Sequence, residues 1–215
     1  MKKLIINADD FGSSAVFNGK IIELLEKGFI KSTTVMVNRL TEAMNPQTRQ
    51  LSAIKGISIG LHIELDPAKA LRKQMDYQYK KFLGVFGFPP SHFDMHVPKM
   101  DSEKMSNPNI ITELNKFAER RQLPVRNQGA ETKARHTTYQ AFHNASFTRE
   151  LSEIEGFLSR MNDGESAELI THPGDYDPDS KSSLNKERKE DFDKIILLQP
   201  ILEKLGISNI SYFEL

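Results

Sequence analysis

The stretch Leu4–Gly12, LIINADDFG, joins a short apolar run to a pair of adjacent aspartates. The run is rich in isoleucine, which is typical of a strand buried on both faces. Asp9 and Asp10 follow where that strand should end, and two adjacent carboxylates are costly there unless a cation or a proton lies between them. Because neighbouring strand residues point to opposite faces, both aspartates serve one site only if the backbone turns, which we expect at Phe11-Gly12. The structural alternative is an Asx-turn or a helix N-cap ahead of Ser13.

Four of the six histidines lie in or at the end of similar apolar runs. His62 closes the run 57–62 and His172 closes the run 167–172, after which Pro173-Gly174 forces the chain to turn. Parallel strands bring their carboxyl ends to one rim of an α/β fold. Imidazoles and carboxylates that converge at such a rim are typical of a divalent metal site.

His92, Asp94 and His96 alternate along one expected strand, so their side chains share one face. Polar groups on a single face must point into a cleft or pair with one another. A structural histidine–aspartate pair is one interpretation. Metal binding, with a carboxylate that orients an imidazole, is the favoured one.

Two more charged residues stand at strand ends. Arg126 ends the short run 124–126 and has two open roles: it could hold a substrate oxygen or phosphate, or pair with an acid of the site. We assign Arg126 and Asp94 to substrate binding. Glu64 shares a strand face with His62 and could be a ligand or an orienting partner.

Strands that alternate with helices predict a mainly parallel sheet. We expect strands at residues 4–8, 32–37, 57–63, 92–97, 124–126, 138–142, 168–171 and 207–213, and helices at 14–28, 41–54, 70–86, 109–121, 148–161 and 182–205 with an interruption near Pro200. About eight strands are enough to close a (β/α) barrel, and no linker divides residues 1–215, so we expect one domain. The charged run 186–190 is expected to be a solvated helix turn.

Composition narrows the range of functions. Lysine plus arginine equals aspartate plus glutamate, so no global field would attract nucleic acid or an anionic membrane. The absence of cysteine restricts any metal to nitrogen and oxygen ligands. Without a signal-peptide core or a membrane-length apolar run, a soluble cytoplasmic protein is expected.

A family resemblance rests on seven segments in a fixed order: residues 7–12 (NADDFG), 31–38, 60–62 (GLH), 92–96 (HFDMH), 123–126, 171–174 (THPG) and 210–215. Their order and spacing resemble the YdjC-like family, which includes the ChbG-type chitooligosaccharide deacetylases. The resemblance extends from about Lys3 to the C-terminus, and NADDFG is its most specific part.

The resemblance implies a distorted, TIM-barrel-like (β/α) barrel and one divalent metal ion, Mg²⁺ or Zn²⁺, bound by Asp10, His62 and His96. It implies that Asp9 is the general base and that His172 stabilises or protonates the tetrahedral species. The implied reaction removes an N-acetyl group from an amino sugar or a short oligosaccharide, free or phosphorylated. Two imidazole ligands favour zinc or another transition metal. The family also implies a homodimer.

The chain departs from the family pattern in two places. Val97-Pro98-Lys99 follows His96 where the family usually carries further histidines, and the chain is shorter around residues 67–86. Two rival functions stay open, and the altered segment after His96 gives weight to the non-catalytic one. One is a glycosidase or phospho-sugar hydrolase that uses Asp9 with Asp94 or Glu64. The other is a non-catalytic sugar-binding protein on the same fold.

Overall fold

The computed structural model describes residues 1–97, 108–143 and 150–215. The strands are β1 (Lys2–Phe11), β2 (Ser32–Val35), β3 (Ser58–Ile63), β4 (Phe93–Met95), β5 (Phe142–His143), β6 (Ser166–Thr171) and β7 (Ile207–Asn209). The helices are α1 (Ala15–Glu26), α2 (Asn45–Ala53), α3 (Leu71–Phe86), α5 (Pro108–Arg121), α6 (Leu151–Ser159) and α7 (Arg188–Lys204). Two short 3-10 helices, η1 (Glu42–Met44) and η3 (Tyr212–Glu214), complete the elements used below.

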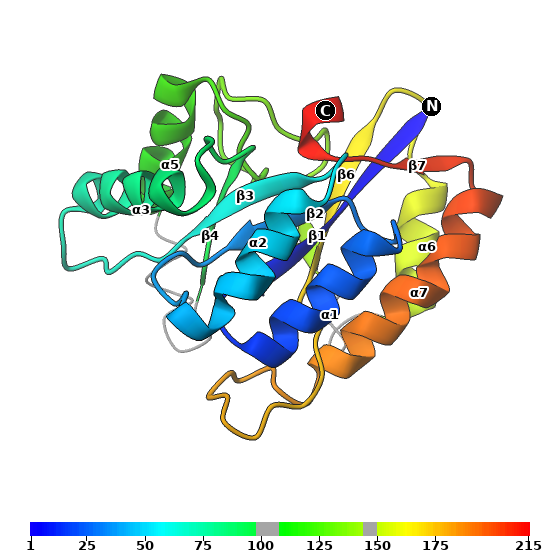
Figure 1. The fold of residues 1–215 in the computed structure, drawn as a ribbon. Coiled ribbons are helices and arrows are strands. Elements are labelled where there is room, and N and C mark those ends of the chain that lie inside the picture. Colours follow the sequence, from blue (N-terminus) through cyan, green and yellow to red (C-terminus); the bar gives the residue numbers. More distant parts are fainter. Residues whose placement is uncertain (98–107, 144–149) are drawn as a thin grey trace.

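The strands form one parallel sheet in the order β4-β3-β2-β1-β6-β5, with β7 beside the start of β1 (Figure 1). The segment 125–127 links the two outer strands. Arg126 N donates to Phe93 O at 2.9 Å, and Ala141 N donates to Asn127 O at 2.8 Å. The sheet therefore curls into a distorted barrel, as the sequence predicts.

The alternation of β1 decides what fills the inside of the barrel. Leu4, Ile6 and Ala8 belong to the main apolar core that the helices cover. The intervening Ile5 packs with Ile210 and Tyr212 in a separate small cluster. The next residues on that inner face, Asn7 and Asp9, are buried and polar. The interior is thus apolar at the start of β1 and polar toward its carboxyl end.

Helix α1 shows how local sequence sets the elements around this rim. The Ser14 side chain caps it by accepting from Val16 N at 3.0 Å, and Gly28, at φ 71°, follows its end. Figure 1 shows α3 and α5 beside β3 and β4, and α1, α6 and α7 on the other side of the molecule.

Four expectations on the elements are corrected. The run 124–126 is not a strand, since only Val125 forms an isolated bridge, to Phe93. The run 207–213 is not one strand but β7 followed by η3. Helix α7 begins only at Arg188, because the Asn185 side chain bonds the backbone of Asp177 and holds the preceding segment in a loop: its Oδ1 accepts from Asp177 N at 3.0 Å and its Nδ2 donates to Asp177 O at 2.6 Å. The same helix continues through Pro200, with Leu198 and Leu202 buried on either side.

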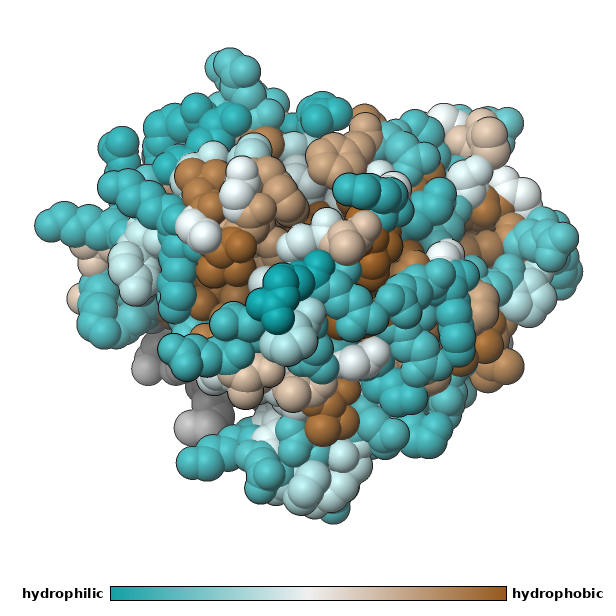
Figure 2. Space-filling view, viewed as in Figure 1, coloured by the Kyte–Doolittle hydropathy of each residue, from teal (hydrophilic) through white to brown (hydrophobic). Residues whose placement is uncertain are grey.

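The surface is mixed. Figure 2 shows a face dominated by hydrophilic residues, with apolar groups separated by polar side chains. Within the three described ranges, no helix has the length and apolar character needed to cross a bilayer.

Candidate active site

The two aspartates of β1 reach one site because the backbone turns at Asp10. Asp10 has φ 71°, and the pairing of β1 with β2 shifts register between Ala8 and Phe11. Aspartate is among the few residues that tolerate this left-handed conformation. The turn was expected one residue later. The N-cap alternative does not apply, because Ser14 caps α1.

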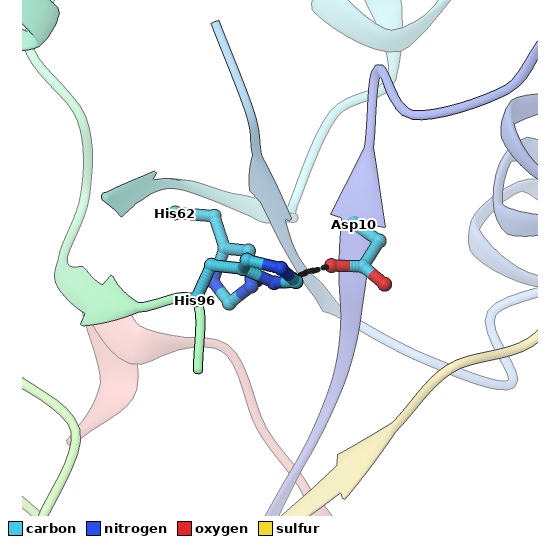
Figure 3. Close-up of side chains that lie close together, drawn as sticks. All are labelled: Asp10, His62 and His96. Carbon is cyan, nitrogen blue, oxygen red and sulfur yellow. Dashed lines mark ion pairs between the residues drawn. The ribbon is translucent and has the colours of Figure 1, made fainter. Parts of the chain in front are cut away.

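Asp10, His62 and His96 converge at the carboxyl ends of β1, β3 and β4 (Figure 3). Oδ1 of Asp10 lies 3.3 Å from Nε2 of His62 and 3.4 Å from Nδ1 of His96. Metal–ligand bonds of about 2.1 Å in a tetrahedral arrangement place donor atoms about 3.4 Å apart. Oδ1 of Asp10 is buried and has no hydrogen-bond partner within the described part of the chain. The donor types, their separation and this unbonded oxygen fit a divalent cation.

The protonation of these groups follows from their neighbours. Burial alone would raise the pKa of Asp10, but the adjacent imidazoles of His62 and His96 and the charge of Arg188 hold it well below its usual value. Burial alone would lower the pKa of His62, but the charges of Asp94 and Asp9 raise it well above its usual value. The cluster without a metal therefore attracts a proton to the place that a cation would take.

Asp94 holds the ring of His62. Its Oδ1 lies 2.5 Å from Nδ1 of His62, which turns Nε2 toward Asp10. Oδ2 of Asp94 accepts from Thr34 at 3.1 Å and pairs with Arg126 at 2.7 Å. Since both oxygens are used inside the protein and the side chain is completely buried, the geometry favours an orienting carboxylate over the substrate-binding assignment.

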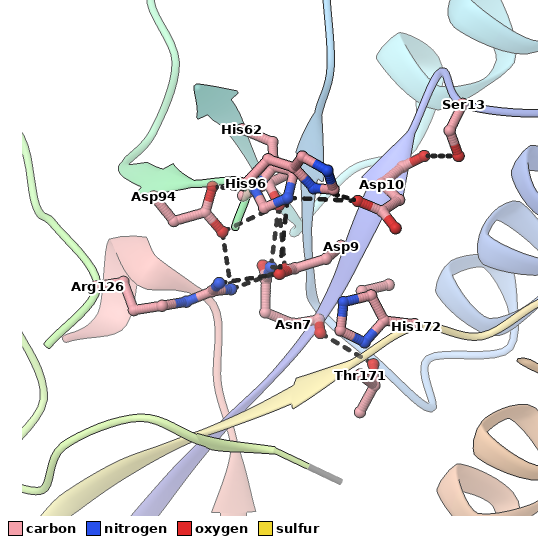
Figure 4. A network of polar contacts seen from close by, with 12 residues as sticks. Asn7, Asp9, Asp10, Ser13, His62, Asp94, His96, Arg126, Thr171 and His172 are labelled. Carbon is pink, nitrogen blue, oxygen red and sulfur yellow. Dashed lines mark hydrogen bonds and ion pairs between the residues drawn. The ribbon is translucent and has the colours of Figure 1, made fainter. Parts of the chain in front are cut away.

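Arg126 forms a bidentate ion pair with Asp9 (Figure 4). Nη1 donates to Oδ2 at 2.9 Å and Nη2 to Oδ1 at 2.7 Å. Burial alone would raise the pKa of Asp9, but the guanidinium holds it far below its usual value. Arg126 is itself buried, so of its two roles the structure favours pairing with an acid. Asp9, His62 and Asp94 also form a group with metal-ligand spacing, but the guanidinium already supplies a cation there.

Each oxygen of Asp9 has its own set of partners. Oδ1 accepts from Arg126, Asn7 (2.6 Å) and Thr34 (3.2 Å). Oδ2 faces Nε2 of His62 at 3.9 Å. Oδ2 is therefore the oxygen best placed to meet a group bound at the histidines.

His172 completes the rim from β6. Figure 4 shows its ring beside the carboxylates of Asp9 and Asp10. Burial alone would raise the pKa of both aspartates. The charge of His172 is one of the smaller contributions that lower it. The backbone N–H of His172 donates to Oδ2 of Asp191 at 2.8 Å, which fixes the start of the turn at Pro173-Gly174.

Arg188 is a site residue that sequence reasoning missed. The run 186–190 was expected to be solvated, but the Arg188 side chain is 1% exposed. Its Nη2 donates to Oδ2 of Asp10 at 2.5 Å, and its guanidinium lies 4.0 Å from the centre of the Phe17 ring. One buried arginine within a charged run leaves no local pattern, so only the packing of α7 reveals it.

Two other candidates lie outside the cluster. His92 shares the inward face with Asp94 but lies deeper, where it contacts Ser91 and stacks on Tyr212. Glu64 pairs with Arg39 at 2.8 Å. Pro98 and Lys99, which carry the departure after His96, lie outside the described residues.

A cavity of about 360 Å³ opens beside this rim. It begins at Glu64, two residues beyond His62, and extends along the first turns of α3. Its lining is formed by Asn38, Glu64, Lys69, Ala70, Lys73, Gln74, Tyr77 and Gln78. The volume falls within the range of small-molecule sites.

The fold and the donor set define a class: a parallel α/β barrel that gathers an Asp-His-His cluster at its carboxyl rim. Residues 3–74 match the model of the YdjC-like protein family. A chitooligosaccharide deacetylase of Serratia marcescens is 29% identical, over 82% of this chain and 83% of the relative. A carbohydrate deacetylase of Geobacillus stearothermophilus is 26% identical, over 98% and 96%. The family-model match and these relatives confirm the resemblance to the YdjC-like family that the sequence indicates.

The fold is also that of a solved structure. A protein of Enterococcus faecalis V583, proposed to cleave cellobiose phosphate, superposes with a TM-score of 0.79 at 20% identity. The match covers 99% of this chain and 98% of that one. At this identity the likeness concerns the fold.

Proposed function

We propose that this chain is a metal-dependent hydrolase that removes an N-acetyl group from an amino sugar or a short oligosaccharide. One observation carries the proposal: the unbonded oxygen of Asp10 lies between two imidazole nitrogens, with the Arg126-bound carboxylate of Asp9 next to it. The relatives named as deacetylases of carbohydrates supply the reaction class.

Asp10, His62 and His96 would hold the cation. When bound, it would act as a Lewis acid on the acetyl carbonyl and make water a better nucleophile at neutral pH. Oδ2 of Asp9 accepts the proton of the attacking water as its oxygen bonds to the acetyl carbon. Arg126 keeps that carboxylate in place, and Asp94 keeps Nε2 of His62 turned toward the site.

His172 serves the second half of the reaction. The carbon–nitrogen bond breaks, and His172 donates a proton to the departing sugar nitrogen, so that acetate and a free amine leave. Its position just after β6, with its ring beside the carboxylates of Asp9 and Asp10 (Figure 4), supports this role. Arg188 holds Asp10 and takes no part in proton transfer.

The cavity beside the rim offers a place for the neighbouring part of the substrate. Tyr77 is largely exposed there and can stack on a sugar ring, while the lysines and amides can bond hydroxyl or phosphate oxygens. For the ion, two imidazoles favour zinc or another transition metal over magnesium.

The glycosidase alternative finds less support. It needs one carboxylic acid that stays protonated beside the scissile bond. Asp9 and Asp94 instead share one guanidinium, and Glu64 pairs with Arg39. Burial raises the pKa of Glu168, but this acid lies out of reach of solvent.

The test is acetate release. The protein is loaded with Zn²⁺ or Mg²⁺ and incubated with N-acetylglucosamine oligomers, free and phosphorylated, with a chelated control. We expect acetate that disappears with the chelator. Cleavage of the glycosidic bond that resists the chelator would instead support the glycosidase, and binding without any product would support a sugar-binding protein.

The single domain, the homodimer, the cytoplasmic location and the lack of nucleic-acid binding stay predictions.

A further inference from the structure

The C-terminal turn of the chain lies under the candidate site. Ser211 N and Oγ both donate to Glu214, at 2.8 and 2.9 Å, and so close the turn η3. Tyr212 of this turn is 1% exposed, and its ring stacks on His92 with 3.6 Å between ring centres and 10° between planes. Packing alone needs only the ring, yet both the hydroxyl and the backbone N–H of Tyr212 are hydrogen-bonded.

The first route from Tyr212 runs through side chains. Its hydroxyl donates to Oε2 of Glu168 at 2.5 Å, and Oε1 of Glu168 accepts from Nε of Arg126 at 2.8 Å. The terminal nitrogens Nη1 and Nη2 of the same guanidinium donate to the carboxylate of Asp9. Burial and the charge of Glu168 raise the pKa of Tyr212 well above its usual value, so the hydroxyl keeps its proton and donates.

The second route runs through small polar groups. Tyr212 N donates to Oγ of Ser58 at 3.2 Å, Ser58 donates to Ser32 at 2.9 Å, and Ser32 donates to Oδ1 of Asn7 at 2.5 Å. Nδ2 of Asn7 then donates to Oδ1 of Asp9 at 2.6 Å. All donors point the same way along this chain, which is the arrangement in which hydrogen bonds strengthen one another.

We propose that Tyr212 is a positioning residue for Asp9, which it holds through Glu168 and Arg126 on one side and through Ser58, Ser32 and Asn7 on the other. This inference rests on the proposed function of Asp9 as general base. Three carboxylates, Asp9, Asp94 and Glu168, compete for the one guanidinium of Arg126. The Tyr212 hydroxyl supplies Glu168 with a second hydrogen-bond donor. Glu168 then needs only Nε of Arg126, and the two terminal nitrogens, Nη1 and Nη2, remain for Asp9 and Asp94.

The test compares Tyr212→Phe with Tyr139→Phe. Tyr139 also donates its hydroxyl to a glutamate next to β6, at 2.6 Å to Glu165, but that pair lies at the opposite end of the strand from Asp9. Tyr212→Phe leaves the ring stack and removes one donor. We expect kcat for acetate release to fall about tenfold, with KM and metal affinity unchanged, and Tyr139→Phe to match the wild type.

A double-mutant cycle separates positioning from a general loss of structure. In the background Asp9→Asn, where no base is left to position, Tyr212→Phe should not lower the residual rate further. Equal losses in both backgrounds, or wild-type kcat in Tyr212→Phe, would overturn the proposal.

A third readout does not need turnover. The Nε–H of Arg126, followed by nitrogen-15 NMR and assigned by its loss in Arg126→Lys, should exchange slowly with solvent in the wild type and in Tyr139→Phe. It should exchange at least tenfold faster in Tyr212→Phe. If the wild type releases no acetate while this difference is present, the proposed function fails and the positioning network stands. An unchanged exchange rate refutes the network even if the enzyme is active.

Discussion

Arg188 bonds the oxygen of Asp10 that faces away from the histidines. Nη2 of Arg188 lies 2.5 Å from Oδ2 of Asp10, while Oδ1 lies 3.3 Å from Nε2 of His62. The two partners are 178 residues apart in the sequence. One buried arginine therefore fixes the rotation of the carboxylate and leaves its second oxygen for a cation.

Replacing Arg188 should weaken metal binding. In Arg188→Gln the carboxylate of Asp10 loses its anchor, and a partner outside the ligand set typically contributes about 10–100-fold in metal affinity. Calorimetric titration with Zn²⁺ measures the change. Lys189→Gln is the matched control, because its neighbour Lys189 is exposed and pairs only with Asp193 in the described structure. Equal affinity in Arg188→Gln and the wild type would contradict this role.

Metal affinity should rise with pH. Although burial opposes it, the charges of Asp94 and Asp9 raise the pKa of His62 well above 6.5. Below that pKa a cation must displace the proton on Nε2, so affinity should rise about tenfold per pH unit and level off above it. Titrations in buffers of different ionisation enthalpy, from about pH 6 to about pH 8, measure the proton released.

Asp94→Asn provides the control for this pH dependence. Without the charge of Asp94 the pKa of His62 falls, and the plateau should begin at a lower pH. A wild-type affinity that stays constant below neutral pH would contradict the protonated state of His62 without metal.

That the polar groups at the ends of β1, β3 and β4 meet at one rim could be predicted because the signal is local, whereas the choice of Asp10, His62 and His96 as ligands came from the family resemblance. Each residue ends an apolar run or alternates along one, and a parallel sheet brings such ends to one rim. A backbone turn that brings Asp9 and Asp10 to one site could also be predicted. Its place at Asp10, with φ 71°, depends on the register shift against β2.

The residues that support the cluster could not be predicted in this way. Arg188 is buried because α7 packs it over Phe17 and against Gly174, where an added Cβ would lie 3.0 Å from the Arg188 side chain. Tyr212 lies in an expected strand that is a 3-10 turn instead. Both depend on contacts between distant parts of the chain, which no period in the sequence encodes.

Asp9→Asn should keep the metal and lose turnover. The amide keeps the shape of Asp9 but cannot accept a proton, and general base catalysis typically contributes about 10²–10⁴-fold. Metal affinity should stay near the wild-type value, because Oδ1 of Asp10 remains. Asp163→Asn, at an exposed aspartate near the N-terminus, serves as the control. Wild-type kcat in Asp9→Asn would remove Asp9 from the mechanism.

Tyr77→Ala tests the cavity beside the rim. If a sugar next to the acetylated residue stacks on Tyr77, KM for an oligosaccharide should rise about fivefold while KM for a monosaccharide stays constant. Val85→Ala, on the exposed side of the same helix and outside the cavity, should change neither. A rise for both substrates alike would mean that Tyr77 does not distinguish their length.

Gly60 and Gly84 should respond to alanine in opposite directions. A Cβ at Gly60 would lie 2.4 Å from the His92 ring, and that ring cannot withdraw because Tyr212 stacks on it. Overpacking of this kind costs about 1–3 kcal/mol, so Gly60→Ala should lower Tm by several degrees. A Cβ at Gly84, inside α3, meets no atom within 4 Å. Because alanine has a higher helix propensity than glycine, Gly84→Ala should stabilise the folded protein by about 0.5–1 kcal/mol. Thermal unfolding of both variants measures the difference.

Because Tyr212 is also bonded to Glu168, Gly60→Ala should lower kcat as well as Tm. A Gly60→Ala protein with wild-type Tm would show that His92 does not fill the space beside this glycine.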